Sequence, residues 1–255
     1  MYKIDLFVIL LLCSDKDMVS FIRPMSKHHF FRDLYSHFSS PITALDCGEK
    51  CAPYNQGGIP FCCDTRHSVP TAYEDEWGYL QENTDLWHLW QVRNNHQYNR
   101  LVKQLPSGQT LLECKGYQYC QRDFRSVACR AFPFFPYFTS GGSFLGLSYY
   151  WEYEDRCWVI SNLAAVKSHY RTEFIFTFEQ LFYIYPEEIN NFMHQSKRMR
   201  SYFQHQQRAI ILLHRNGNNY KLSPKNERLR KMADYQFTKH GNYLLSSLMP
   251  FPDEQ

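Results

Sequence analysis

The chain has 255 residues, of which 44% are hydrophobic and 17% aromatic, and its formal net charge is +3. This length is enough for one large domain or two small ones with a buried core. A mean hydropathy of −0.52 together with the many aromatic side chains excludes a disordered chain and a membrane-embedded body, and predicts a soluble globular protein.

Near the N-terminus, the apolar run Leu6–Cys13 is far shorter than the ~20 residues that span a bilayer. Only Lys3 precedes the run, and no small-residue cleavage site follows it, which argues against a signal peptide. We therefore expect translation to begin at Met18 or Met25, and we predict a cytoplasmic protein with no membrane span. In a reducing compartment, clustered cysteines form metal or redox sites in preference to disulfides.

The pattern of elements predicts an α+β fold in three parts. These are an N-terminal extension (1–24), a small cysteine-rich metal-binding domain of short strands and helices (25–165), and a basic, mainly helical C-terminal region (166–255). The first expected element is an amphipathic helix over Met25–Phe38, with Phe30, Leu34 and Phe38 on one face.

Between this helix and residue 165, short elements are expected around the cysteines. Thr71–Glu74 has the pattern of a capping box and predicts a helix to about Asn83. The expected strands are Leu86–Val92, Asn99–Leu105, Thr110–Cys114 and Phe144–Tyr153, with Pro106–Gly108 as the hairpin turn between the second and the third. The aromatic segment Arg130–Pro136 is stiffened by two prolines and is expected to plug the cysteine site.

The C-terminal region is expected to be helical and basic. Thr177–Gln180 resembles a second capping box, and Pro186 begins a helix to about Arg208. A hairpin follows over Ile210–His214 and Asn219–Leu222, and a last helix runs from Ser223 to about Tyr235. Residues 195–240 contain eleven Lys or Arg and two acids, so this region is the expected surface for a protein partner. Few aromatics alternate with these charges, which disfavours nucleic acid.

Eight of the nine cysteines lie between residues 47 and 157, and residues 158–255 contain none. In chain order they form two groups of four, a dense group and a group of singletons. The predicted metal ligands are Cys47, Cys51, Cys62, Cys63, Cys114, Cys120, Cys129 and Cys157. Four thiolates are what one tetrahedral zinc ion or one iron–sulfur cluster requires. The sequence therefore predicts a protein that binds zinc or iron, the latter including an iron–sulfur cluster.

The vicinal pair Cys62–Cys63 indicates more than one metal position, because consecutive side chains diverge and rarely chelate one tetrahedral ion. A disulfide framework and free buried or catalytic thiols are the alternatives to metal.

Three motifs resemble the YkgJ-type cysteine-cluster family, which is described as zinc- or iron-chelating. They are Cys47-x3-Cys51, Gly57-Gly58 shortly before the vicinal cysteines, and the segment Cys129–Phe134. The resemblance covers about Asp46–Cys157, and it implies that the eight cysteines are the ligands, with Cys13 outside the set. The ten residues between Cys51 and Cys62 depart from the commoner, tighter spacing of the family.

A related cysteine cluster occurs in bacterial flagellin lysine N-methylases, so the resemblance also implies an alternative role as a cluster-dependent enzyme or redox protein. The sequence contains no nucleotide-binding glycine motif, no zinc-protease motif and no nucleophile elbow. Whether the chain is an enzyme stays open at this point.

Overall fold

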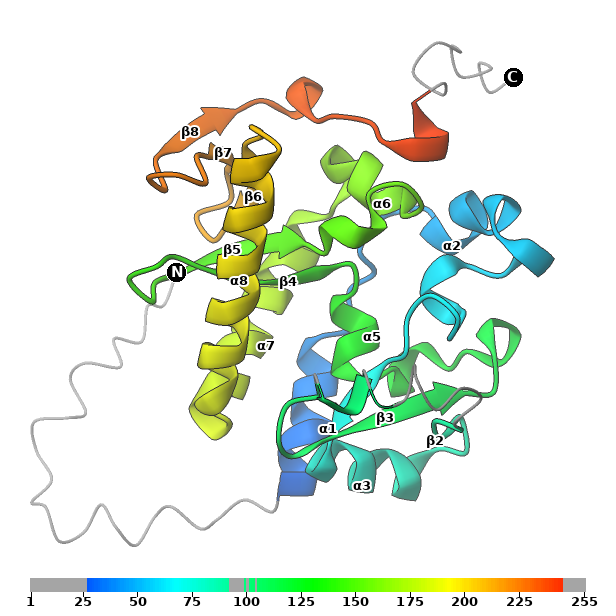
Figure 1. The fold of residues 1–255 in the computed structure, drawn as a ribbon. Helices are drawn as coiled ribbons and strands as arrows, with labels where there is room; N and C mark the ends of the chain where they lie inside the picture. Colours follow the sequence, from blue (N-terminus) through cyan, green and yellow to red (C-terminus); the bar gives the residue numbers. More distant parts are fainter. Residues whose placement is uncertain (1–26, 92–98, 100, 104, 245–255) are drawn as a thin grey trace, which may run out of the picture.

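The structure is a computed structural model that describes residues 27–91, 99, 101–103 and 105–244. Helices and two antiparallel sheets make up this part of the chain, so the predicted α+β class is confirmed (Figure 1). No helix among the described residues is long and apolar enough to cross a membrane. The N-terminal run Leu6–Cys13 and the start-codon prediction lie outside the described residues.

The first predicted helix is confirmed as α1 (Lys27–His37), and the predicted first residues Met25 and Ser26 lie outside the described residues. Helix α1 forms because apolar side chains recur at helical spacing, and the face that contains Phe31, Leu34, Tyr35 and Phe38 is buried. Short 3₁₀ turns connect the later elements: η3 (Ala52–Tyr54), η4 (Gln56–Gly58), η5 (Phe61–Cys63), η6 (Tyr117–Tyr119), η7 (Arg122–Phe124), η8 (Trp151–Tyr153), η9 (Leu163–Ala165), η10 (Asp234–Gln236) and η11 (Gly241–Tyr243).

A three-stranded sheet in the order β1-β3-β2 supports the cysteine region. Its strands are β1 (Thr71–Tyr73), β2 (Trp87–Leu89) and β3 (Gln109–Cys114), and helix α3 (Glu74–Asn83) follows β1. The predicted cap of α3 was wrong: Thr71 pairs with Leu111 inside the sheet, and Tyr73 is the N-cap, whose backbone amide donates to Glu76 at 3.2 Å. The helix ends at Asn83, as predicted.

The predicted strand Asn99–Leu105 was also wrong. Asn99 and residues 101–103 are helical, and β3 pairs with β1 and β2 instead. Of the predicted strand Leu86–Val92, residues 87–89 form β2, and Val92 lies outside the described residues.

A five-stranded antiparallel sheet has the order β4-β5-β6-β7-β8 and includes residues on both sides of position 165. Its strands are β4 (Phe134–Phe138), β5 (Phe144–Tyr149), β6 (Ile210–His214), β7 (Asn219–Leu222) and β8 (Leu229–Met232). The hairpin of β6 and β7 is confirmed at both strands. The predicted last helix was wrong, because Leu229–Met232 forms the edge strand β8, which pairs with β7.

Two long helices, α7 (Ser168–Ile184) and α8 (Glu187–His205), pack against each other and against this sheet, α7 on β5 and α8 on β4 and β6 (Figure 1). The helix predicted to begin at Pro186 is confirmed as α8, with Pro186 as its N-cap rather than in its first turn. Thr177 does not begin a helix, because it lies buried in the middle of α7. The C-terminal region therefore contributes three strands to the second sheet in addition to its helices.

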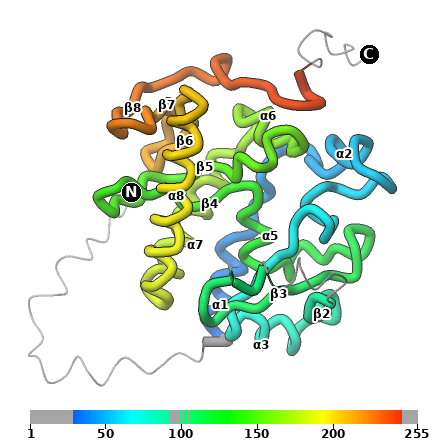
Figure 2. The backbone as a smooth tube through the Cα atoms, in the orientation of Figure 1, coloured from blue at the N-terminus to red at the C-terminus, as the bar shows by residue number. Residues whose placement is uncertain are grey.

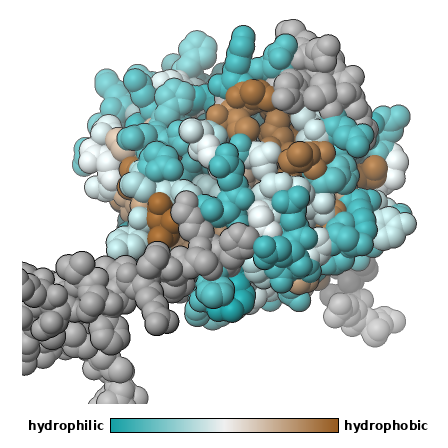
Figure 3. Space-filling model, turned by 90° about the horizontal axis from the view of Figure 1, so that it is seen from below, coloured by the Kyte–Doolittle hydropathy of each residue, from teal (hydrophilic) through white to brown (hydrophobic). Residues whose placement is uncertain are grey.

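One apolar core joins both sheets, from Phe31 on α1 through Leu112 on β3 to Leu212 on β6. The surface in Figure 3 is mostly hydrophilic, with hydrophobic areas of limited extent. Short helices of the described residues near the cysteines are α2 (Cys47–Cys51), α5 (Val127–Ala131) and α6 (Trp158–Ser161). These three hold four of the eight predicted ligands within them or directly at their ends.

Candidate metal centre

Cys47 and Cys51 are the first and last residues of α2, so their side chains lie on one face, four positions apart. The helix begins at this point because Asp46 caps it, its carboxylate accepting the Gly48 amide hydrogen at 2.9 Å. α2 packs beside α6, whose N-cap is Cys157 (Figures 1 and 2). This packing brings Cys157 close to Cys47 and Cys51, although Cys47 and Cys157 are 110 residues apart in sequence.

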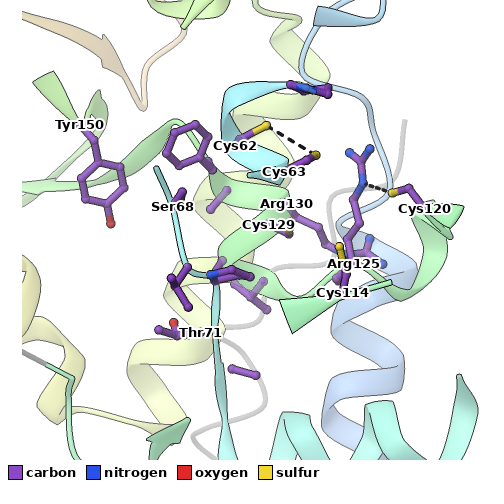
Figure 4. Close-up of a pocket in the computed structure, with 18 of the residues that line it drawn as sticks. Cys62, Cys63, Ser68, Thr71, Cys114, Cys120, Arg125, Cys129, Arg130 and Tyr150 are labelled. Atoms are coloured by element: carbon purple, nitrogen blue, oxygen red, sulfur yellow. Dashed lines mark hydrogen bonds between the residues drawn. The ribbon is translucent and has the colours of Figure 1, made fainter. Parts of the chain in front are cut away.

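The turn η5 positions the vicinal pair, with Cys62 Sγ and Cys63 Sγ 4.0 Å apart (Figure 4). A buried carboxylate fixes the loop around this turn. Asp64 accepts hydrogen bonds from Arg66 Nε at 2.9 Å and Asn55 Nδ2 at 3.0 Å, and these bonds, chiefly that of Arg66, hold the pKa of Asp64 well below its usual range. This network holds the residue that directly follows the vicinal pair.

Three further cysteines come from the segment between β3 and β4. Cys114 is the last residue of β3, Cys120 follows η6, and Cys129 lies in α5. The α5 helix begins because Ser126 caps it, accepting the Cys129 amide hydrogen at 3.3 Å. Arg125 donates from Nε to Cys120 Sγ at 3.2 Å, and Figure 4 shows its side chain among the labelled cysteines.

Mutual effects on pKa are densest around Cys157 and around Cys129, and they also connect these two groups, since Cys63 acts on Cys51 and Cys129 acts on Cys62. Burial, together with the smaller effects of the Cys47 and Cys51 thiols, raises the pKa of Cys157 to about 12. Burial and the Cys51 thiol raise the pKa of Cys47 to about 11. For Cys62, the hydrogen bond to Cys63 is the largest cause of a raised pKa, followed by burial and by further thiols, of which Cys47 has the largest effect. We define the α2 set as Cys47, Cys51, Cys62 and Cys157.

The second set surrounds Cys129. Burial raises the pKa of Cys129, and the thiols of Cys63, Cys114 and Cys120 raise it further. Burial also raises the pKa of Cys114, again with contributions from Cys63 and Cys120. We define the α5 set as Cys63, Cys114, Cys120 and Cys129.

These sets differ from the grouping by chain order, in which Cys62 and Cys63 fell together. The vicinal cysteines lie at the junction: the pKa of Cys62 is affected by both Cys47 and Cys129, and Cys63 affects the pKa of both Cys51 and Cys129. The sequence could not show this, because the grouping depends on how α2, α5 and α6 pack. The 4.0 Å separation also permits both sulfur atoms to bind one ion.

All eight described cysteines are free thiols. The raised pKa values of the buried thiols favour the protonated, unreactive form, which argues against a catalytic free thiol at those positions. The donor type fits a soft metal, since each set offers four sulfur atoms. Within the described residues, however, no group of three or more His, Cys, Asp or Glu side chains is arranged so that it could hold a metal ion. Metal binding therefore requires the thiols of a set to rotate toward a common centre.

A large cavity of about 2080 Å³ adjoins this region. Six cysteines line it, all except Cys51 and Cys157, and its wall continues to polar residues of α8, including Asn191 and Gln195. Of the segment predicted to plug the site, Arg130, Ala131, Phe132 and Phe134 line this cavity, whereas Phe135 is fully buried in β4.

Arg125 is the residue of this region that the sequence analysis missed. Its only signal in the sequence is its position between Cys120 and Cys129, where Arg122 and Arg130 are equally plausible candidates. The structure separates their roles. Arg122 pairs with Asp46 at 2.6 Å, and Arg130 is buried and donates only to backbone carbonyls.

Comparison with protein-family models, with curated proteins and with solved structures gave no match to this chain. The resemblance to the YkgJ-type family therefore stays a prediction.

Proposed function

We propose that this protein binds zinc or iron, the latter including an iron–sulfur cluster, through two sets of four cysteines. The observation that supports the proposal is the convergence of eight cysteines from separate short elements into two adjoining sets around Cys62 and Cys63. Free thiols that bind nothing would not need to gather in this way. Thiolates are soft ligands, and they restrict the metal mainly to zinc, clustered iron or Cu(I).

The pKa values of the thiols have a direct consequence for binding. Most of these thiols are protonated at neutral pH without metal, because burial raises their pKa. Metal binding must then release protons, and affinity must fall as pH decreases. The binding free energy also becomes folding free energy, because each set joins elements that are distant in sequence.

The test is metal analysis and an absorption spectrum of the full chain purified without oxygen. A brown protein with a broad band near ~400 nm indicates an iron–sulfur cluster. A colourless protein with stoichiometric zinc indicates structural or storage binding. Cys129→Ser should lose metal from one set, and Cys13→Ser, outside both sets, is the matched control. A wild-type chain that retains neither metal under these conditions would overturn the proposal.

The cavity beside the cysteines favours a second candidate, a cluster-dependent enzyme or redox protein. A centre that only stabilises the fold does not need a cavity of about 2080 Å³ against six of its ligands. By the family resemblance, methyl transfer to lysine is one such activity. Absorption changes on adding dithionite to the anaerobic protein separate a redox-active cluster from structural zinc.

The remaining proposals concern location and partner. We place the protein in the cytoplasm, where free thiols persist. Its partner surface is the edge strand β8 and the turn before it, which expose Lys225, Arg228, Arg230 and Lys231.

A further inference from the structure

The edge of strand β1 borders the large cavity beside the cysteines. The consecutive residues 68–73 all line this cavity, whereas β3 contributes the alternate residues Gln109, Leu111 and Glu113 before its last residue, Cys114. Successive side chains of a strand point to opposite faces of the sheet. Alternate lining residues therefore mark a face, and consecutive ones mark an edge. The cavity thus covers one face of the small sheet and continues around β1, where Figure 4 shows Thr71.

The hydrogen bonds of β1 show which of its residues point away from the sheet. β1 is an outer strand in the order β1-β3-β2, so only one of its two edges is paired in this sheet. The Leu112 amide donates to the Pro70 carbonyl at 2.9 Å, and the Glu74 amide donates to the Gly108 carbonyl at 2.9 Å. In an antiparallel pair, the backbone groups of successive residues point to opposite edges. Those of residues 70, 72 and 74 therefore point to β3, and those of residues 69, 71 and 73 point to the outer edge.

The outer edge is open at two of these positions. The Tyr73 amide is paired, because it donates to Glu76 Oε2 at 3.2 Å. At Val69 and Thr71, none of the described residues bonds to the outward amide or carbonyl. Val69 is held extended because it precedes a proline, and the missing amide of Pro70 lies on the β3 side, so it does not interrupt the outer edge. Val69 and Thr71 thus present two donors and two acceptors to the cavity.

Helix α8 contributes one of its faces to the same cavity. The lining residues recur mainly at intervals of three or four, and they are Glu188, Asn191, Phe192, His194, Gln195 and Arg198. Gln109 Nε2 donates to Glu188 Oε1 at 3.1 Å and so joins this helix to the small sheet. The helix face is mostly polar although it borders a cavity. Such a wall, next to a free strand edge, suits a ligand with a polar main chain rather than an apolar one.

The charges of this wall indicate which side chains the ligand has. Lys103 lines the cavity, is exposed and pairs with no acid among the described residues. Arg198 is exposed as well and lies 3.6 Å from Glu152. The acids that α3 and α8 contribute to the wall, Glu76 and Glu188, are buried and accept hydrogen bonds from neutral groups of the protein. The charge that these elements expose to the cavity is therefore positive, which is complementary to acidic side chains.

We propose that the cavity binds an extended acidic peptide segment of a partner protein, which adds as a further strand to the outer edge of β1 and pairs with Val69 and Thr71. Main-chain hydrogen bonds supply the affinity in this mode of recognition. The volume of about 2080 Å³ exceeds the roughly 300–1,000 Å³ of small-molecule sites, so a peptide suits its size. The inference does not depend on metal binding, and the site is separate from the basic edge at β8.

The experiment selects peptides from a phage-displayed library of random decapeptides on the immobilised full chain. One selected peptide, fluorescently labelled, is then measured by fluorescence polarisation. We expect selected sequences rich in acidic and β-branched residues. Lys103→Glu should weaken the binding of this peptide roughly threefold.

Thr71→Pro removes the outward amide and should weaken binding about 10-fold or more, because a carbonyl of the peptide loses its donor. Leu229→Pro is the matched control. The Ser223 amide donates to the Arg228 carbonyl, so residue 229 points to the outer edge of β8, and its amide can be removed in the same way outside the cavity. This control should bind the peptide as wild type does.

Peptide variants test the pairing on the wild-type chain. N-methylation of one alternate set of peptide amides should abolish binding, and N-methylation of the other set should have a smaller effect. Equal affinities of the two methylated peptides would overturn the proposal, also where Thr71→Pro fails to fold. A library without a selected peptide, or a selected peptide with unchanged affinity for a folded Thr71→Pro, would overturn it as well.

Hydrogen exchange measured by NMR separates a partner peptide from other occupants of the edge. The amides of Val69 and Thr71 should exchange rapidly in the free monomeric chain and about 10-fold or more slowly with the selected peptide bound. Slow exchange in the free monomer would mean that another segment of this chain pairs with β1. Protection that is lost when a dimer is diluted would mean that a second copy does so. Either result would overturn the proposal.

Discussion

Glu76 on α3 accepts a hydrogen bond from the hydroxyl of Tyr35 on α1 at 2.5 Å, across 41 positions of sequence. The same carboxylate oxygen accepts the backbone amide hydrogen of Val127 at 2.6 Å, at the start of α5. Glu76 is fully buried, so one carboxyl group connects α1, α3 and the helix that contains Cys129.

This arrangement predicts a pH dependence of folding. Burial raises the pKa of Glu76 to about 7, from an ordinary value of 4.5. The unfolded chain loses this proton as pH rises through 4.5, while the folded chain keeps it until about 7, so the contribution of Glu76 to stability is present at low pH and is lost over this interval. The full shift corresponds to about 3 kcal/mol. Glu76→Gln should remove this decline, as urea unfolding between about pH 4 and pH 8 would measure.

Other buried carboxylates, such as Glu188, remain in both proteins, so the difference between the two pH profiles isolates Glu76. Parallel profiles for wild type and Glu76→Gln would contradict the prediction.

Arg130 should be important for stability rather than for metal contact. Its guanidinium donates to four backbone carbonyls, those of Tyr35, Phe38, Asp123 and Arg125, and only 8% of the residue is exposed. Arg130→Met leaves buried carbonyl groups without a donor and should lower the free energy of unfolding by about 3 kcal/mol or more. Arg130→Lys retains the charge but donates to fewer carbonyls. Its free energy of unfolding should therefore lie between those of the wild type and Arg130→Met.

Urea unfolding of the three metal-free proteins measures this effect. A loss below about 1 kcal/mol in Arg130→Met would mean that the loop presenting Arg125 is held by other contacts.

Gly146 is predicted to be irreplaceable at the junction of β5 and β6. Its φ of 140° is unfavourable for other residues, and an added Cβ would lie 2.4 Å from the carbonyl oxygen of Leu213. Gly146→Ala must therefore displace strand β6 and should cost about 3 kcal/mol. Gly141→Ala is the matched control, since its Cβ would meet only Thr139 Oγ1, at 3.8 Å. Equal melting temperatures for both variants would contradict this reading of the junction.

The sequence predicted elements where local signals agreed with tertiary pairing. The helical spacing of Phe30, Leu34 and Phe38 predicted α1, and the turn between the apolar runs Ile210–His214 and Asn219–Leu222 predicted the β6–β7 hairpin. The prediction failed at β8, because Ser223–Pro224 imitates a helix start and Lys and Arg favour helices when isolated. Pairing with β7 overrides that preference, and no local signal reveals it.

The same contrast between local sequence signals and tertiary packing applies to the candidate site. Clustering along the chain was enough to select the eight cysteines as a set, because thiols so concentrated are uncommon outside metal and disulfide sites. Which four belong together was beyond the sequence, since Cys157 reaches Cys47 only through the packing of α6 on α2. The role of Arg125 was hidden for the same reason.

The central claim is that two four-cysteine sets bind metal and meet at Cys62 and Cys63. It is tested most directly by the ratio of bound metal to polypeptide in wild type, Cys62→Ser and Cys63→Ser, purified without oxygen. We predict about two zinc ions per wild-type chain and about one in either variant, or, for clusters, loss of the iron of a different set in each. A ratio that is the same in all three proteins would contradict the account.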